Sequence, residues 1–281
     1  MKLIKTIKEM HSFSDRERGL GKVISFVPTM GFLHEGHLSL MRIGKERGDT
    51  LVISIFVNPS QFGPGEDFEA YPRDLDKDLE LIKHIGADAV FSPERDELYD
   101  ERFQTYVQLE KLPDHLCGIT RPVHFRGVAT VVSKLFNIVK PHISLFGEKD
   151  FQQVAVIRQM VKDLNFDIAI ISAPTIREDD GLAMSSRNTY LTSEQRHSAI
   201  SLYRSLQKAQ ELVNRGQKEA KTIVEAATEL INSYPDTDID YISICDPETL
   251  DAVNTVNGPT LMALAVNVGK AHLIDNMILT T

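Results

Sequence analysis

Two almost uninterrupted runs of apolar, mostly β-branched residues constrain the fold of this chain most strongly. They cover residues 50–57 (TLVISIFV) and 167–172 (DIAIIS). Strands of this kind suit a parallel sheet that helices cover on both faces. Shorter strand-like runs lie at 22–28, 89–91 and 143–146, and helical patterns at 38–47, 73–85 and 150–164. The alternation of strand and helix predicts an α/β domain with a Rossmann-like, doubly wound parallel sheet.

The pattern changes after about residue 175. Helical stripes cover 193–215 and 218–234, and strand-like runs follow at 241–245, 260–268 and 273–279. Helices followed by strands that can form hairpins predict a smaller α+β domain. We therefore expect two domains, 1–175 and 176–281.

Charge, cysteine content and hydropathy exclude several classes of protein. Lys and Arg total 31 against 40 Asp and Glu, a net charge of −9, which disfavours a nucleic-acid-binding scaffold. No run approaches the ~20 apolar residues of a membrane span, and the first ten residues lack the pattern of a secretory signal. The two cysteines, Cys117 and Cys245, have no CxxC spacing and fit a reducing compartment. We expect a cytoplasmic protein with no nucleic-acid or membrane partner.

The segment after the first strand, 28–37 (PTMGFLHEGH), carries the most chemical information. Ligands of open α/β sheets bind at the carboxyl ends of strands. Gly31 and Gly36 allow close approach of the backbone, and a helix that starts near His37 offers free N–H groups to phosphate. As a pair, His34 and His37 could donate to phosphoryl oxygens, whereas a single histidine here would more often cap the helix or pack. Zinc is improbable, because the zincin motif places its histidines at i and i+4.

Two further segments also follow strands. In 56–65, Asn58 and Gln61 carry amides suited to a carboxylate or to hydroxyls, although this segment alone could be a plain surface loop. In 146–153, Lys149 is placed to neutralise phosphate and Asp150 to cap a helix. A surface ion pair of Lys149 with a neighbouring acid is the alternative.

The segment 177–188 (REDDGLAMSSRN) precedes the long helical stripe. Two serines followed by an arginine predict a mobile anion-binding loop, with a solvated turn as the alternative. The acidic run Asp74, Asp76 and Asp78 could approach Mg²⁺, but alternating acids at a helix start are more often solvated charge. P-loop, dinucleotide-binding and nucleophile-elbow motifs do not occur, which excludes the common classes that depend on them.

Together, the four segments closely resemble the pantoate–β-alanine ligase family (pantothenate synthetases) of the nucleotidyltransferase superfamily. The matching pieces are 28–37, 56–63, 146–153 and 181–188, in the family's order, and the similarity extends through 71–73 and 121–125. One histidine motif would indicate only the superfamily, whereas all four segments are specific.

The resemblance assigns roles residue by residue. It implies that ATP is bound by Met30, Gly31, Phe32, Leu33, His34, Glu35, Gly36, His37, Gly147, Glu148, Lys149, Asp150, Ile176, Met184, Ser185, Ser186 and Arg187. His37, His34 and Lys149 are the expected catalytic residues. Gln61 and Gln153 match the pantoate ligands, and Gln61 also faces β-alanine.

Mg²⁺ accompanies ATP in this family, but its protein ligands stay open here, because Lys77 stands where some relatives carry an acid. The resemblance further implies a cytoplasmic homodimer whose 176–281 domain closes over the active site.

The implied reaction agrees with the residues. Pantoate would attack the α-phosphorus of ATP, release pyrophosphate and form an enzyme-bound pantoyl adenylate. The amine of β-alanine would then displace AMP and give pantothenate. Such chemistry needs positioning and charge stabilisation rather than a protein nucleophile. The alternatives are a nucleotidylyltransferase that stops after AMP transfer, which would need more basic residues, and a catalytically idle nucleotide-binding scaffold.

Overall fold

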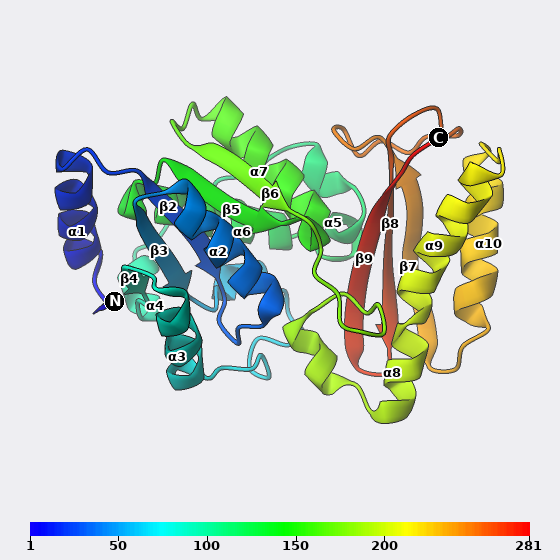
Figure 1. Cartoon of the computed structure of the whole chain (residues 1–281), viewed down its shortest axis with the longest axis horizontal. Coiled ribbons are helices and arrows are strands. Elements are labelled where there is room, and N and C mark those ends of the chain that lie inside the picture. Colours follow the sequence, from blue (N-terminus) through cyan, green and yellow to red (C-terminus); the bar gives the residue numbers. More distant parts are fainter. The chain divides into compact units, whose positions relative to one another are not determined.

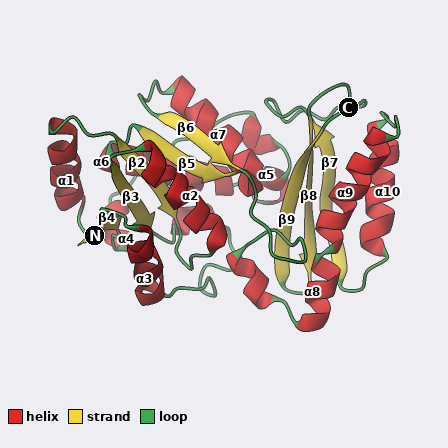
Figure 2. Cartoon of the chain, in the orientation of Figure 1, coloured by secondary structure: helices red, strands yellow, loops and turns green.

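The computed structural model describes all 281 residues (Figures 1 and 2). The chain forms two compact units, each assembled from several segments. The first unit comprises 1–110, 121–148 and 153–174, and the second comprises 111–120, 149–152 and 175–281. None of the helices combines the length and apolar character needed to cross a membrane.

The first unit alternates strands and helices. Its strands are β1 (Lys2–Ile4), β2 (Ile24–Thr29), β3 (Thr50–Ile55), β4 (Ala89–Phe91), β5 (Ile143–Gly147) and β6 (Ala169–Ala173). Its helices are α1 (Ile7–Gly19), α2 (Glu35–Arg47), α3 (Leu75–Ile85), α4 (Arg95–Leu98) and α6 (His124–Val139), with the short 3₁₀ helix η1 (Pro59–Gln61). The 3₁₀ turn η3 (Glu148–Asp150) follows β5 and leads into α7 (Phe151–Asp163).

The six strands form one parallel sheet in the order β1-β4-β3-β2-β5-β6. The central strand β2 pairs with β3 on one side and with β5 on the other. The carboxyl ends of these three strands therefore lie next to one another at one edge of the sheet. This arrangement confirms the predicted Rossmann-like α/β fold.

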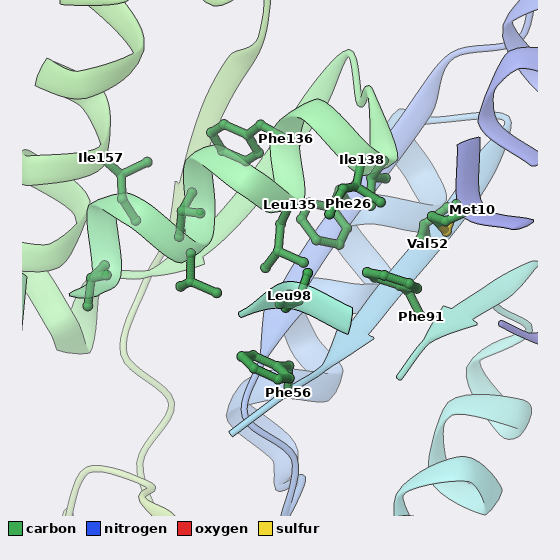
Figure 3. Close-up of a cluster of buried hydrophobic side chains, with 14 of the residues drawn as sticks. Met10, Phe26, Val52, Phe56, Phe91, Leu98, Leu135, Phe136, Ile138 and Ile157 are labelled. Atoms are coloured by element: carbon green, nitrogen blue, oxygen red, sulfur yellow. The ribbon is translucent and has the colours of Figure 1, made fainter. Parts of the chain in front are cut away.

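Alternate residues of each strand enter two separate hydrophobic cores. Phe26, Val52 and Phe91 belong to the core that α1, α6 and α7 cover (Figure 3). Their neighbours Val27 and Ile53 belong to the core beneath α2 and α3. Because both faces are covered, these strands are apolar on both sides, which explains their uninterrupted hydrophobic runs.

The second unit combines helices with an antiparallel sheet. Its strands β7 (Thr237–Cys245), β8 (Thr260–Val268) and β9 (Ala271–Leu279) pair in sequence order. Its helices are α5 (Cys117–Thr120), α8 (Ser193–Ala199), α9 (Ser201–Asn214) and α10 (Ala220–Asn232), with 3₁₀ turns η2 (Leu112–Asp114) and η4 (Ser186–Tyr190). The apolar stripes of α9 and α10 pack on the sheet in a third core. This is the predicted smaller α+β fold.

Three differences from the sequence-based prediction have local causes. The single helix predicted over 193–215 is wrong: it breaks at Ile200, between α8 and α9, where a β-branched residue and two nearby serines weaken helix propensity. Helix α6 was not predicted, because most of its residues are apolar and buried and were not recognised as a helix; the polar residues Arg126, Lys134 and Asn137, which recur along one side, were the available signal. The strand β1 and helix α1 also escaped prediction, since the first is only three residues long.

Candidate active site

The loop that joins β2 to α2 is built around a buried carboxylate. Gly31 and Phe32 adopt left-handed backbone angles, with φ of 81° and 50°. Asp78 of α3 accepts hydrogen bonds from the backbone N–H of Phe32 at 2.8 Å and of Leu33 at 2.7 Å. A Cβ atom at position 31 would lie 2.9 Å from Oδ2 of Asp78, so the loop needs glycine there.

The two histidines of this loop lie side by side at the start of α2. His34 occupies the N-cap position, and its ring centroid is 4.1 Å from that of His37. The backbone N–H of His34 donates to Nδ1 of His37 at 3.3 Å. Because Nδ1 of His37 accepts this bond, the proton of its neutral ring lies on Nε2. His37 can therefore act as a hydrogen-bond donor through Nε2.

The acidic run of α3 does not form a magnesium cage. Asp78 is buried and both of its oxygens bind backbone amides. Burial raises the pKa of Asp78 above its usual value, more strongly than the bonds from Leu33 and Phe32 lower it. Asp74 caps α3 by accepting from the backbone N–H of Lys77 at 3.1 Å, and Asp76 is exposed. No group of three His, Cys, Asp or Glu side chains is arranged to hold a metal ion.

The amides that follow β3 are ordered by η1. Asn58 and Gln61 are both buried, and Nδ2 of Asn58 donates to Oε1 of Gln61 at 3.1 Å. Nε2 of Gln61 approaches Sδ of Met30 at 3.0 Å, which connects this segment to the loop after β2. Gly127 of α6 packs against η1 so closely that an added Cβ would lie 2.3 Å from the carbonyl oxygen of Ser60. Glycine at 127 therefore allows the contact.

The segment after β5 contains two glutamines with different surroundings. Gln152 is buried in the second unit, where it donates to the carbonyls of Leu112 and His115 and accepts from the backbone N–H of Cys117. Gln153, in the first unit, is only half-buried and has no such anchor. The amide of Gln153 is therefore the one available to a ligand.

In the second unit, Lys149 is held through its backbone. Its carbonyl accepts from Nδ2 of Asn276, on β9, at 2.9 Å. The ammonium group of Lys149 lies 4.0 Å from a carboxylate oxygen of Asp150, too far for a tight ion pair, and the Lys149 side chain is 20% exposed. The anticipated alternative of a surface ion pair is thus present only in a loose form.

The loop before η4 is fastened to the same strand. Arg177 makes two hydrogen bonds to the buried carboxylate of Asp275, at 2.6 and 2.9 Å, and its guanidinium lies over the ring of Tyr203. The Met184 N–H donates to the Ile176 carbonyl at 2.9 Å. This pairing brings together the two ends of the loop, so residues 177–183 are held rather than solvated freely.

The predicted anion-binding residues come next in the chain. The Ser185 hydroxyl caps η4 by accepting from the backbone N–H of Arg187 at 3.2 Å. Ser186 is buried, whereas the Arg187 side chain is half-buried. Two other predicted ATP contacts, Glu35 and Glu148, have partners within the protein. Glu35 pairs with Arg42 on the same helix, α2, and Glu148 accepts from the hydroxyl of Ser172 at 2.7 Å.

Each unit thus assembles its own part of the predicted set. The first contains residues 30–37, Gln61, Gly147, Glu148 and Gln153 at the carboxyl ends of β2, β3 and β5. The second contains Lys149, Asp150, Ile176 and 184–187 near β9.

Four supporting residues were missed or misread from the sequence. Asp78 was considered as a magnesium ligand or, more often for such acids, as solvated charge, and Arg177, Asp275 and Asn276 were not given a role. The adjacent polar pair Asp275 and Asn276 within a largely apolar strand was the available signal.

Fold and site define a class of protein. Histidines, glycines and a helix N-terminus at the carboxyl edge of a parallel sheet suit a phosphate-bearing ligand. The chain is therefore an α/β protein of the Rossmann-like, nucleotide-binding kind.

Comparisons with known proteins specify the family. The model of pantoate–β-alanine ligase matches residues 2–278. The pantothenate synthetase of Desulfatibacillum aliphaticivorans is 60% identical over 279 residues, 99% of both chains. A crystal structure of the enzyme from Thermus thermophilus superposes with a TM-score of 0.96 at 42% identity over the full length of both chains. The ligase from Francisella tularensis, complexed with β-γ ATP and β-alanine, gives 0.80 at 33% identity, covering 99% and 97% of the two chains.

The chain belongs to the pantoate–β-alanine ligase family. It is an enzyme, a ligase that condenses pantoate with β-alanine to pantothenate, and ATP is a substrate of this reaction.

Proposed function

We propose that the residues described above carry out this condensation in two steps on the enzyme. First, a carboxylate oxygen of pantoate attacks the α-phosphorus of ATP and pyrophosphate leaves. Second, the amine of β-alanine attacks the acyl carbon of the pantoyl adenylate, loses a proton and expels AMP. The oxygen that bridged carbon and phosphorus leaves with AMP. The protein positions the reactants and stabilises negative charge on the phosphates.

His37 and His34 are the proposed donors to the phosphates in the first unit. The bond from the His34 N–H leaves the proton of a neutral His37 ring on Nε2, where it can be donated to a phosphoryl oxygen. The N-terminus of α2, a helix of 13 residues, adds a positive dipole at the same place. The Asp78 carboxylate supports this arrangement because it fixes the loop that ends in His34.

Lys149 is the proposed phosphate-binding cation of the second unit. Its backbone is held by Asn276, and its ammonium group pairs only loosely with Asp150, at 4.0 Å. The other proposed ATP contacts are Met30, Gly31, Phe32, Leu33, Glu35, Gly36, Gly147, Glu148, Asp150, Ile176, Met184, Ser185, Ser186 and Arg187.

Gln61 and Gln153 are the proposed pantoate ligands, and Gln61 is also proposed to face β-alanine. Uncharged amides suit this task because pantoate offers a carboxylate and two hydroxyls. The half-buried amide of Gln153 and the oriented amide of Gln61 support the assignment.

Four further properties complete the proposal. Mg²⁺ would accompany ATP and supply positive charge at the phosphates, and the acids of α3 would not hold it, because Asp78 and Asp74 accept hydrogen bonds from backbone amides. The enzyme works as a homodimer in the cytoplasm. Residues 1–175 bind ATP and pantoate, and 176–281 form the smaller C-terminal domain.

One observation carries the proposal: two adjacent histidines at the start of α2, one of them oriented as a donor, on a loop fixed by a buried carboxylate. The test is isotope exchange between labelled pyrophosphate and ATP. Pantoate alone should support exchange, and β-alanine alone should not. Exchange that requires β-alanine, or formation of ADP in the complete reaction, would contradict the adenylate route.

A further inference from the structure

The side-chain amide of Asn58 has only one possible orientation. Its Oδ1 accepts from the backbone N–H of Ser60 at 3.3 Å, and a backbone N–H can only donate. Its Nδ2 donates to the carbonyl of Gly127 at 3.1 Å, and a carbonyl can only accept. Exchanging the two ends of the amide would place donor against donor and acceptor against acceptor.

The orientation of Asn58 determines that of Gln61. Nδ2 of Asn58 also lies 3.1 Å from Gln61, so the atom that it faces must be the acceptor Oε1. The Oε1 lone pairs are thereby directed into the protein. Nε2 of Gln61 lies 3.0 Å from the sulfur of Met30, a weak acceptor, and carries two protons. Gln61 therefore presents a donor to a ligand.

A hydroxyl pair extends this sequence of bonds in one direction. The Ser60 hydroxyl lies 2.9 Å from Oδ1 of Asn58, which has no proton, so Ser60 is the donor. Since a serine hydroxyl has one proton, the 3.1 Å bond between Ser60 and Tyr99 must be donated by Tyr99. Tyr99 is buried, and burial raises the pKa of its hydroxyl to about 12, so it keeps its proton.

We propose that Tyr99 and Ser60 are positioning residues that act through Asn58 to fix Gln61 as a hydrogen-bond donor toward an oxygen of pantoate. The proposal rests on the assignment of Gln61 to pantoate and adds the polarity of that contact. Gln153, which is half-buried and lacks this network, is free to donate or accept.

The polarity is tested by comparing Gln61→Ala with Gln61→Glu, and Gln153→Ala with Gln153→Glu. A glutamate at 61 removes the donor and directs an acceptor at pantoate. We expect Gln61→Glu to bind pantoate about tenfold more weakly than Gln61→Ala. The two Gln153 variants control for repulsion between the introduced glutamate and the pantoate carboxylate. At position 153, Glu should weaken pantoate binding less, relative to Ala, than it does at position 61. The polarity would be overturned if Glu, relative to Ala, weakened pantoate binding at position 61 no more than it does at position 153.

We call the hydrogen-bonded series Tyr99, Ser60, Asn58 and Gln61 the relay. It is tested with Ser60→Ala, Ser60→Thr and Tyr99→Phe. Loss of one hydrogen bond typically costs about 0.5–1.5 kcal/mol, or roughly 2- to 13-fold in affinity. Ser60→Ala and Tyr99→Phe should raise the KM for pantoate by about this factor while the KM for ATP and kcat change less than twofold. Ser60→Thr keeps the hydroxyl and should restore the KM. Ser133→Ala, which removes a buried hydroxyl elsewhere in the first unit, is the control.

An unchanged KM for pantoate in Ser60→Ala and Tyr99→Phe would overturn the relay, as would a loss in Ser60→Ala that Thr does not restore. The relay would also be overturned if the KM for ATP rose in proportion to the KM for pantoate and Ser133→Ala had the same effect. That result would indicate general destabilisation of the protein. Failure of the proposed function is distinguishable: the unmodified enzyme would then show no pantoate-dependent exchange of pyrophosphate.

Discussion

Replacing Asp78 by Asn tests whether this carboxylate shapes the histidine loop or binds a metal. An asparagine keeps one acceptor oxygen and turns an NH₂ group toward the backbone N–H of Phe32 or Leu33. The native bonds are 2.8 and 2.7 Å long. Leaving one buried donor unpaired costs about 1–3 kcal/mol. The carboxylate itself is desolvated, which raises its pKa, so its removal recovers part of that cost.

We therefore expect a net loss of about 1–2 kcal/mol in stability, or roughly 2–8 °C in Tm for a chain of this size. The effect on catalysis should be larger, because a shift of about 1 Å in the loop can reduce the rate about 100-fold. Pantoate-dependent pyrophosphate exchange should fall about 10- to 100-fold in a protein that remains folded at 25 °C. Asp76→Asn, an exposed acid on the same helix, is the matched control and should match the unmodified enzyme.

Two outcomes would refute this reasoning. Exchange within twofold of the unmodified rate, together with the lower Tm, would show that the loop does not depend on Asp78 for function. An increase in the Mg²⁺ concentration needed for half-maximal rate, without a fall in the rate at saturating Mg²⁺, would show that Asp78 binds the metal.

Three further predictions follow from other parts of the chain. Lys149→Ala and His37→Ala should each lower the adenylation rate about 10²–10³-fold without unfolding the protein, and near-normal pyrophosphate exchange would contradict their roles. Gln152→Ala should lower Tm because three backbone groups lose their partner, whereas Gln153→Ala should weaken pantoate binding at unchanged Tm; calorimetry measures both. Hydrogen bonds from Lys22 and, second in size, from Arg16 lower the pKa of the buried Glu17 to about 2. The charged form of Glu17 therefore adds up to about 3 kcal/mol to the free energy of unfolding above pH ~4.5, and this contribution is lost as the pH falls toward 2. Glu17→Gln should therefore lower Tm at pH 6 but not at pH 2, and an equal loss at both would contradict this account.

The sequence predicted those parts of the fold that show either a continuous apolar run or an apolar stripe at helical spacing. In the strands β3 and β6 this pattern is a nearly continuous run of apolar residues. In the helices α7, α9 and α10 it is a stripe of apolar residues on one face. Helix α6 was missed because the sheet, α1 and η1 enclose most of its surface, which makes most of its residues apolar. Its narrow polar side, marked by Arg126, Lys134 and Asn137, was the signal that could have identified it.

The site was predictable where it depends on contiguous residues and less so where it depends on tertiary contacts. His34 and His37 are only three positions apart in the chain, so their proximity follows from the sequence. The bonds from Phe32 and Leu33 to Asp78 cross more than forty positions, and those from Arg177 to Asp275 nearly a hundred. No local pattern distinguishes such a carboxylate from solvated acids, which is why Asp78 was interpreted as a surface charge.

The central claim, activation of pantoate as an adenylate, is tested most directly with pantoate labelled by ¹⁸O in its carboxylate. The labelled substrate is converted with ATP and β-alanine, and the AMP is analysed by mass spectrometry. If a carboxylate oxygen attacks the α-phosphorus and leaves with AMP, each AMP should carry one ¹⁸O and the pyrophosphate none. Unlabelled AMP, or label in inorganic phosphate formed with ADP, would contradict the account.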